Sequence, residues 1–388
     1  MPFDCQHRAR FGHDACMTDC PTARDLPTFH YARVERPGDV PAGDPAVVDL
    51  ALLDMHHGWP NLGHDALVHA LQNAVCDISE DLAEAALGVR VVSYDVRRGL
   101  AIPEPPGGRY GLYMGTGGPG HLDPALNDGS TPVSQGIRED PSWEAPLFRL
   151  FEAIRASPDA ALFGVCHTFG VMCRWLGVAD VVVRGPAKGG KSAGIVENLL
   201  TDEAAAHPWF SRLSWRLPDG RRLHVLDNRL FDLVPRGRLP AGLTPIGYET
   251  LGVGGPQGEG LTMLEVARDR VGVMPRIFGV NHHPEIVNRP RQVHILRKKL
   301  ERGDVTPEWY AERMRTLTEP IADDWGDRLL HLTSTYTLMA PLRFHLYRLV
   351  RERAEALGRR LAVDEATLPL TYNLATDSLT SRRRPPAR

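Results

Sequence analysis

A cysteine that follows an apolar run could act as a nucleophile. In ALFGVCHTFGVMCRWLG, the run reaches Gly164-Val165-Cys166, and helical spacing begins directly after it. A residue on such a strand-to-helix turn is exposed above a sheet, and the free N–H groups at the start of the helix favour a negatively charged sulfur. Taken alone, Cys166 also fits a small buried core cysteine, as most unpaired cysteines are.

A second segment, RIFGVNHHPEIV, offers the base that a thiol nucleophile needs. His283 and Glu285 stand two residues apart after another apolar run. In a chain stiffened by Pro284, His283 would take the proton from Cys166 and return it to the leaving group, while Glu285 would fix the imidazole tautomer. Alone, this segment is also compatible with a strand end that carries surface histidines.

A glycine-rich loop could supply donors for an oxyanion. Gly117-Gly118-Pro119-Gly120 follows the apolar run YGLYM, and its backbone can approach a ligand closely. Its N–H groups could stabilise a developing negative charge together with the N–H of His167, the residue after the candidate nucleophile. A glycine-proline turn without function is the alternative.

The elements around these segments predict a parallel α/β sheet. Apolar strand-like runs alternate with segments of helical spacing, which is typical of βαβ units, and ligands bind beyond the carboxyl ends of such strands. Shorter strands and hairpins are expected over 180–281, and helices from Gln292 onward, with a kink or break at Pro341. The expected strands are AVVDLALLD, VRVVSYDV, YGLYMGTG and DAALFGVC, and the expected helices are DALVHALQNAV and APLFRLFEAIRAS.

In this order, the GGPG loop, the G-x-C turn and the H-P-E element resemble the class I glutamine amidotransferases. The resemblance covers about residues 45–290 and implies a flavodoxin-like α/β/α sandwich with a mostly parallel sheet. It also implies glutamine hydrolysis through a γ-glutamyl thioester, with release of ammonia. By this resemblance Cys166 is the nucleophile, His283 the base, Glu285 its orienting residue and Gly118 an oxyanion donor beside Gly117.

The sequence departs from the family at the nucleophile. Family members usually read G-x-C-x-G-x-Q, and the glutamine helps to hold the substrate. Here Thr168 replaces the second glycine and Gly170 replaces the glutamine. Loss of a side-chain amide deletes hydrogen bonds to the substrate and can change specificity strongly. We therefore expect a small-molecule amide as substrate, glutamine by default, with His167 and Gly170 at the substrate site. Another amide, an acyl transfer, or a non-catalytic binding or regulatory subunit remain alternatives.

A competing motif runs from Gly185 to Ser192. It matches G-x-x-x-x-G-K-S, the phosphate-binding P-loop, and follows the strand-like run DVVVR. Gly194 is a poor start for the helix that must face the phosphate, and Pro186 removes an N–H donor. A P-loop NTPase is thus a further hypothesis, beside a hairpin near the mouth of the active site.

Composition limits the classes of partner. The 388 residues carry a net charge of −3, which excludes a broadly basic protein that binds nucleic acid by neutralising phosphates. No apolar run reaches the ~18 residues that cross a bilayer, and no secretory signal is visible. The six cysteines are too sparse for a disulfide framework. We expect a soluble cytoplasmic protein with no membrane or nucleic-acid partner.

Four regions are predicted along the chain: an irregular arm (1–40), the amidotransferase-like domain (41–290), a helical extension (291–360) and a partly disordered tail (361–388). The arm contains possible zinc ligands without a C-x-x-C pair, so we expect no metal or other cofactor. These residues are Cys5, His7, His13, Cys16 and Cys20. No SGGxDS-type loop of a synthetase is present, so the ammonia acceptor would be a separate chain. The helical extension is a candidate docking surface for it, although helices more often pack on the sheet.

Overall fold

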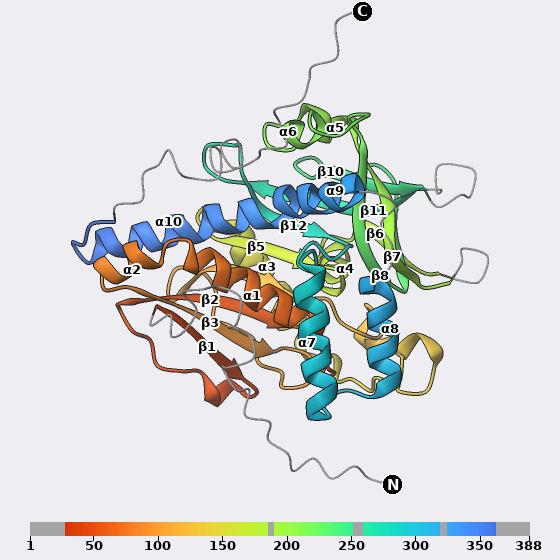
Figure 1. The fold of residues 1–388 in the computed structure, drawn as a ribbon, viewed down its shortest axis with the longest axis horizontal. Coiled ribbons are helices and arrows are strands. Elements are labelled where there is room, and N and C mark those ends of the chain that lie inside the picture. The colour runs from red at the N-terminus through yellow and green to blue at the C-terminus, as the bar shows by residue number, and fades with distance from the viewer. Residues whose placement is uncertain (1–27, 185–189, 251–258, 319–323, 362–388) are drawn as a thin grey trace, which may run out of the picture.

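One large sheet organises the molecule. In the computed structural model, which describes residues 28–184, 190–250, 259–318 and 324–361, ten strands form this sheet (Figure 1). Their spatial order is β1 (Phe29–Val34), β3 (Gly88–Asp95), β2 (Val47–Asp54), β4 (Tyr110–Gly115), β5 (Ala161–Val165), β12 (Pro275–Val280), β11 (Glu259–Arg268), β10 (Thr244–Thr250), β7 (Ser192–Leu200) and β8 (Arg222–Arg229). Pairing is parallel from β1 to β12 and antiparallel from β12 to β8. Strands β6 (Ala179–Val183) and β9 (Phe231–Pro235) pair separately.

Helices cover both faces of the parallel part. Side chains alternate along β2, so Leu50 and Leu52 pack in one core cluster while Ala51 and Leu53 pack in another. The first cluster includes residues of α1 (Leu62–Cys76) and α10 (Ala340–Ala356), and the second includes residues of α3 (Glu144–Ala156) and α4 (His167–Leu176). The fold is therefore a flavodoxin-like three-layer α/β/α sandwich, as the sequence predicts, and each expected strand and helix named above is present.

The parallel strands bring their carboxyl ends to one edge. The segments that follow β2, β3, β4, β5 and β12 contain His56, Arg97, Gly117, Cys166 and His283, respectively. Because these five strands are neighbours in the sheet, residues up to 227 positions apart in the sequence share one edge. This is the edge at which open α/β sheets bind ligands.

The helical extension begins with α7 (Arg289–Arg302) and α8 (Pro307–Thr318), and α9 (Asp324–Ser334) leads into α10. Pro341 does not end the helix. The interruption expected there takes the form of a π-helical turn, η7 (Thr335–Met339), directly before α10. Such a turn accommodates a proline because it rearranges the backbone hydrogen bonds that the ring would block.

Shorter elements complete the chain. The helices are α2 (Ser79–Glu84), α5 (Asp202–Ala206), α6 (Ser211–Ser214) and the 3₁₀ turns η2 (Pro37–Asp39), η3 (Pro124–Leu126), η4 (Pro132–Ser134) and η5 (Pro141–Trp143). None of the helices in the described part of the chain is both long and apolar enough to span a membrane.

Two predictions need correction. The irregular arm predicted for 1–40 is wrong over residues 29–34, because β1 pairs in register with β3 as a parallel edge strand. The P-loop hypothesis is wrong as well, because the segment after Lys191 is strand β7, where phosphate binding needs a helix amino terminus. The possible zinc ligands, residues 185–189 of the P-loop motif and the tail after residue 361 lie outside the described residues.

Candidate active site

Cys166 occupies a strained turn between β5 and α4. Its φ of 49° and ψ of −102° are unusual for a residue with a side chain, and such backbone strain is often found at functional sites. The Cys166 N–H donates to the Val280 carbonyl on neighbouring β12 at 2.7 Å, which fixes the turn against the sheet. Gly164 allows α4 to pack closely, since a Cβ there would lie 2.5 Å from Met172 Sδ. The predicted strand-to-helix turn at Cys166 is thus present.

His283 and Glu285 form a buried pair beyond β12. His283 Nδ1 lies 2.7 Å from Glu285 Oε1, and the His283 N–H donates to the Leu226 carbonyl at 2.8 Å. Burial alone would lower the pKa of His283, but the Glu285 carboxylate and the Cys166 sulfur raise it well above its usual value. Gly63 of α1 gives the carboxylate room, because a Cβ there would lie 2.8 Å from Glu285 Oε1.

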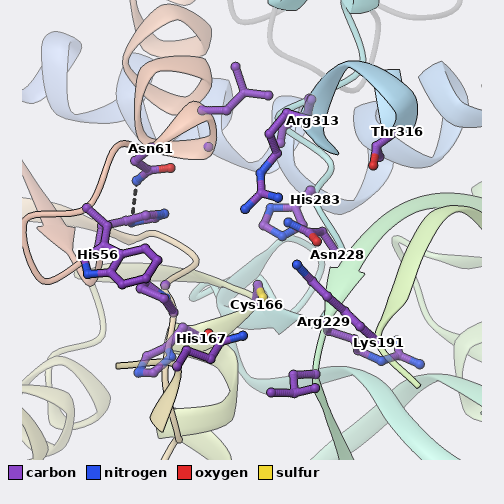
Figure 2. A pocket seen from close by; sticks show the side chains of 18 of the residues that line it. His56, Asn61, Cys166, His167, Lys191, Asn228, Arg229, His283, Arg313 and Thr316 are labelled. Atoms are coloured by element: carbon purple, nitrogen blue, oxygen red, sulfur yellow. Dashed lines mark hydrogen bonds between the residues drawn. The ribbon is translucent and has the colours of Figure 1, made fainter. Parts of the chain in front are cut away.

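The sulfur and the imidazole meet beside Gly117. A Cβ on Gly117 would lie 2.9 Å from His283 Cε1, 3.4 Å from Cys166 Cβ and 3.8 Å from Cys166 Sγ. Figure 2 shows Cys166 and His283 among the side chains that line the same pocket. Within the described residues, His283 Nε2 is buried without a hydrogen bond of normal geometry, so this nitrogen is placed to hold the proton of the thiol, as the raised pKa of the imidazole favours.

Gly118 and His167 lie where oxyanion donors are expected. Both line the pocket that contains Cys166. The His167 N–H is at the first position of α4, where a helix offers no acceptor. Burial lowers the pKa of His167 well below its usual value, although the nearby Gly118 backbone opposes this shift, so the side chain is a neutral imidazole.

The pocket over Cys166 has a volume of about 240 Å³. Its walls come from the carboxyl ends of the strands, from the residues at the start of α1 and from α8 of the helical extension. Trp309 and Arg313 of α8 line it, so the extension forms part of the site. Lys191 of the supposed P-loop binds Glu312 at 2.9 Å, and Glu312 also lies 2.8 Å from Arg313, which ties α8 to the start of β7.

The two departures from the family motif are packed into the core. Gly170 does not line the pocket, whereas Leu122 does. A Cβ on Gly170 would lie 2.4 and 2.6 Å from the two methyl groups of Leu122. The Thr168 hydroxyl donates to the Thr116 carbonyl at 2.7 Å, and its side chain fills the space above Gly115. The prediction of Gly170 as a substrate contact is therefore wrong, because Leu122 stands in front of it.

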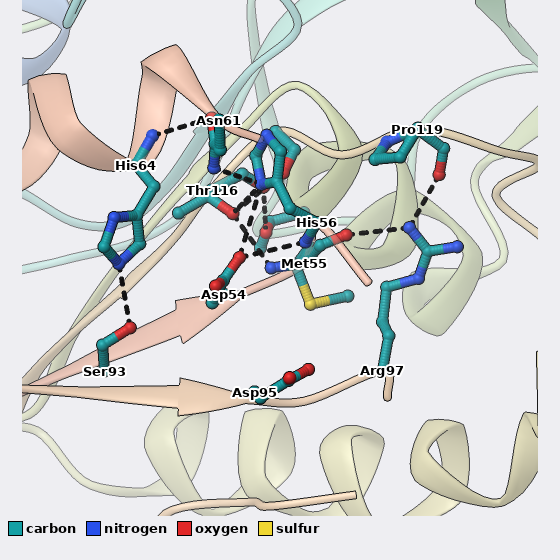
Figure 3. Close-up of polar contacts among 12 residues, drawn as sticks. Asp54, Met55, His56, Asn61, His64, Ser93, Asp95, Arg97, Thr116 and Pro119 are labelled. Atoms are coloured by element: carbon teal, nitrogen blue, oxygen red, sulfur yellow. Dashed lines mark hydrogen bonds and ion pairs between the residues drawn. The ribbon is translucent and has the colours of Figure 1, made fainter. Parts of the chain in front are cut away.

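Sequence reasoning missed His56, which lines the pocket after β2 (Figures 2 and 3). Asn61 Nδ2 contacts His56 Nδ1, while Asn61 Oδ1 accepts the N–H of His64 at 2.9 Å, which orients the amide. Burial lowers the pKa of His56 to about 4, although the Asp54 carboxylate opposes this shift. At neutral pH the ring is uncharged, and Nε2 carries the proton if Nδ1 accepts from Asn61. The strand-end rule that located Cys166 would also have found His56.

No cluster of His, Cys, Asp and Glu in the described ranges has the arrangement of a metal site. The chemistry that the side chains offer is nucleophilic: a thiol, an imidazole held by a carboxylate, and free N–H groups around one cavity.

The chain was compared with known proteins. The sequence matches no protein-family model and no curated protein. Among solved structures, it is similar to a glutamine amidotransferase from Thermotoga maritima, with 17% identity, 78% of this chain and 98% of the other covered, and a TM-score of 0.41. It is also similar to a putative GMP synthase component from Thermoplasma acidophilum, with 11% identity, coverage of 66% and 98%, and a TM-score of 0.35. A putative ThuA-like protein from Bacteroides uniformis has 8% identity, coverage of 63% and 86%, and a TM-score of 0.32. These values are low, and the chemistry assigned to this chain rests on the geometry of its own pocket.

Proposed function

We propose that the protein is a cysteine-dependent amide hydrolase of the glutamine amidotransferase type. The observation that carries the proposal is the meeting of Cys166, on a strained turn, with a His283 whose Nδ1 is held by Glu285 at 2.7 Å. A lone core cysteine needs neither the strain nor the paired imidazole.

The residues suit two successive acyl transfers. Cys166 Sγ attacks the amide carbon, its proton passes to His283 Nε2, and the carbonyl oxygen becomes an oxyanion facing the N–H groups of Gly118 and His167. The C–N bond then breaks, His283 returns the proton to the departing nitrogen, and ammonia or an amine leaves behind a thioester. Water attacks the thioester with His283 as base, and the carboxylic acid is released as Cys166 recovers its proton.

Glutamine is the default donor, and its ammonia would pass to a separate synthetase. A second candidate is a different amide, or acyl transfer to an acceptor other than water. The observation that favours this candidate is Leu122, an apolar side chain at the pocket wall in front of Gly170. The volume of about 240 Å³ is below the roughly 300–1,000 Å³ of drug-sized ligand sites and suits a small acyl donor.

Intact-mass analysis tests the proposal. The protein is incubated with glutamine and a panel of small amides, and ammonia release is measured in parallel. We expect an acyl adduct on the wild type and on Cys76→Ala, which removes a half-buried thiol on α1, and none on Cys166→Ala. Turnover of another amide, with glutamine inert, would favour the second candidate. Absence of any adduct and of any reaction at Cys166 with thiol reagents would overturn both and leave a non-catalytic binding role.

A further inference from the structure

A buried arginine, Arg97, binds the loop of residues 117–120 that would stabilise the oxyanion. Arg97 follows β3, and its side chain is fully buried. One terminal nitrogen, Nη1, donates to the Met55 carbonyl at 2.8 Å and to the Pro119 carbonyl at 2.7 Å (Figure 3). Arg97 therefore joins the segment after β2 to the segment after β4, directly beside Gly118.

The other side of the guanidinium is anchored by Glu139. Nε and Nη2 of Arg97 donate to the two carboxylate oxygens at 2.5 and 2.8 Å, in the forked geometry that orients a guanidinium best. Glu139 also accepts from Trp143 Nε1 at 2.9 Å and from Asn127 Nδ2 at 2.6 Å. Since the carboxylate is as fully buried as the arginine, the pair has no solvent to compete with it and little freedom to move.

The rest of the loop is held in the same way. Gln135 Oε1 accepts the Gly120 N–H at 2.8 Å. Asn127 binds both the N–H and the carbonyl of His121, at 2.7 and 2.9 Å. Each of these backbone groups is thus directed by a side chain, so the loop has one preferred conformation.

One donor of the loop has no partner among the backbone groups of the described residues. The Gly117 carbonyl accepts from the Thr116 hydroxyl at 2.8 Å. In a trans peptide the next N–H, that of Gly118, points in the opposite direction. No backbone acceptor in the described segments pairs with it. A side chain at Gly118 would collide with the Met55 carbonyl, 2.3 Å from a Cβ, so the loop can approach this closely only as glycine.

We propose that Arg97 is a positioning residue that keeps the Gly118 N–H directed at the carbonyl attacked by Cys166, with Glu139 as its anchor. This inference rests on the proposed function. Its consequence for regulation is that the oxyanion site is formed in the isolated chain, so acylation of Cys166 does not wait for a partner protein to turn the loop.

Two reactions of the same thiol separate positioning from general damage. Acylation by p-nitrophenyl acetate passes through a tetrahedral oxyanion and releases p-nitrophenolate. Alkylation by iodoacetamide displaces iodide at a saturated carbon and forms no oxyanion. Removing an oxyanion donor typically costs about 10²–10³-fold in rate. For Arg97→Lys we expect acylation to slow by about tenfold to 10³-fold, while alkylation changes less than about threefold.

A matched variant controls for the loss of a buried arginine. Arg276 is also buried and donates to backbone carbonyls, among them those of Ile154, Ser157 and Ala160 at 2.7–2.9 Å, but it lies at the other end of β12. Arg276→Lys should leave the ratio of acylation to alkylation unchanged. Two milder variants cover the case in which Arg97→Lys does not fold. Glu139→Gln turns one acceptor oxygen into a donor, so it loses one arm of the fork together with either the Asn127 or the Trp143 contact. Gln135→Asn withdraws only the acceptor of Gly120. Both should lower the same ratio by less.

The outcomes are distinct. Equal slowing of acylation and alkylation in the Arg97 and Glu139 variants would overturn the positioning role, as would acylation at the wild-type rate in every variant. If wild-type Cys166 alkylates but takes no acyl group from the ester, the proposed function itself fails. A wild type that acylates only after addition of a cell extract would overturn the inference that the oxyanion site forms without a partner.

Discussion

At the scale of single residues, Gly117 lies against both Cys166 and His283, and only a hydrogen atom fits where its side chain would point. A methyl group there would lie 2.9 Å from His283 Cε1 and 3.4 Å from Cys166 Cβ. Gly117→Ala should force the imidazole and the thiol apart, and a shift of about 1 Å can cost 10²-fold in rate. We expect at least that loss in acylation of Cys166. The unfolding free energy should fall by no more than the roughly 1–3 kcal/mol typical of overpacking.

The matched control is Gly43→Ala, at an exposed glycine with nothing within 4 Å of an added Cβ. It should keep both activity and stability. Stopped-flow acylation and urea unfolding measure the two quantities. A Gly117→Ala protein that acylates at the wild-type rate would show that the sulfur and the imidazole do not act across this gap.

At the scale of elements, helix α4 and the segment before η3 are coupled through Gly170 and Leu122. Alanine is favoured over glycine inside a helix by about 1 kcal/mol, so Gly170→Ala would ordinarily stabilise. Here the added methyl would meet Leu122, with its two methyl groups at 2.4 and 2.6 Å. We therefore expect Gly170→Ala to destabilise by about 1–3 kcal/mol. Leu122→Ala should cost about 2–5 kcal/mol by leaving a void.

The double variant tests the contact between position 170 and Leu122. In Leu122→Ala/Gly170→Ala the new methyl fills part of the void, so the double variant should be more stable than Leu122→Ala alone. Urea unfolding of the four proteins gives the coupling free energy. Additive losses would mean that Leu122 does not exclude a side chain from position 170.

Local sequence patterns predicted the elements that position Cys166, His283 and Glu285, because strand and helix periods and the turn at Cys166 are visible within a few residues. The P-loop hypothesis failed at Gly194, the residue that already argued against a helix in the sequence. Gly194 has a φ of 102° and lies inside β7. The contacts of Arg97 with the loop and the position of α8 at the pocket could not be predicted, since both depend on residues far apart in the sequence. The substitution at Gly170 was visible, but its meaning needed Leu122, 48 positions earlier in the chain.

At the scale of the whole molecule, buried neutral histidines make stability depend on acid pH. Burial lowers the pKa of His56 to about 4 and those of His282 and His345 to about 3. In the unfolded chain these rings titrate near 6.5. As the pH falls from about 6.5 towards 4, these rings bind protons in the unfolded state but stay neutral in the folded state, so the unfolding free energy decreases. Each ring contributes a slope of up to about 1.4 kcal/mol per pH unit.

His283 acts in the opposite sense and in another pH range. Its pKa is raised in the fold, so below about 6.5 it is protonated in both states and adds no slope there. Urea unfolding at pH 7, 6 and 5 should therefore give a falling free energy, to which His56, His167, His282 and His345 contribute. His345 can be removed without touching the pocket, since its Nε2 bonds the Pro275 carbonyl at 2.8 Å at the far end of β12.

His345→Gln keeps a donor for that carbonyl and removes one titrating ring. The slope of the unfolding free energy between pH 6 and 5 should therefore decrease by about 1.4 kcal/mol per pH unit, the contribution of one proton. His331→Gln, at a half-exposed position on α9, is the control and should leave the slope as it is. A wild-type slope that His345→Gln does not reduce would mean that the ring is protonated within the fold. In that case the acid sensitivity arises from the other buried histidines or from carboxylates, such as the Asp54 group whose pKa is held well below its usual range by His56, His64 and Arg33 against the opposing effect of burial.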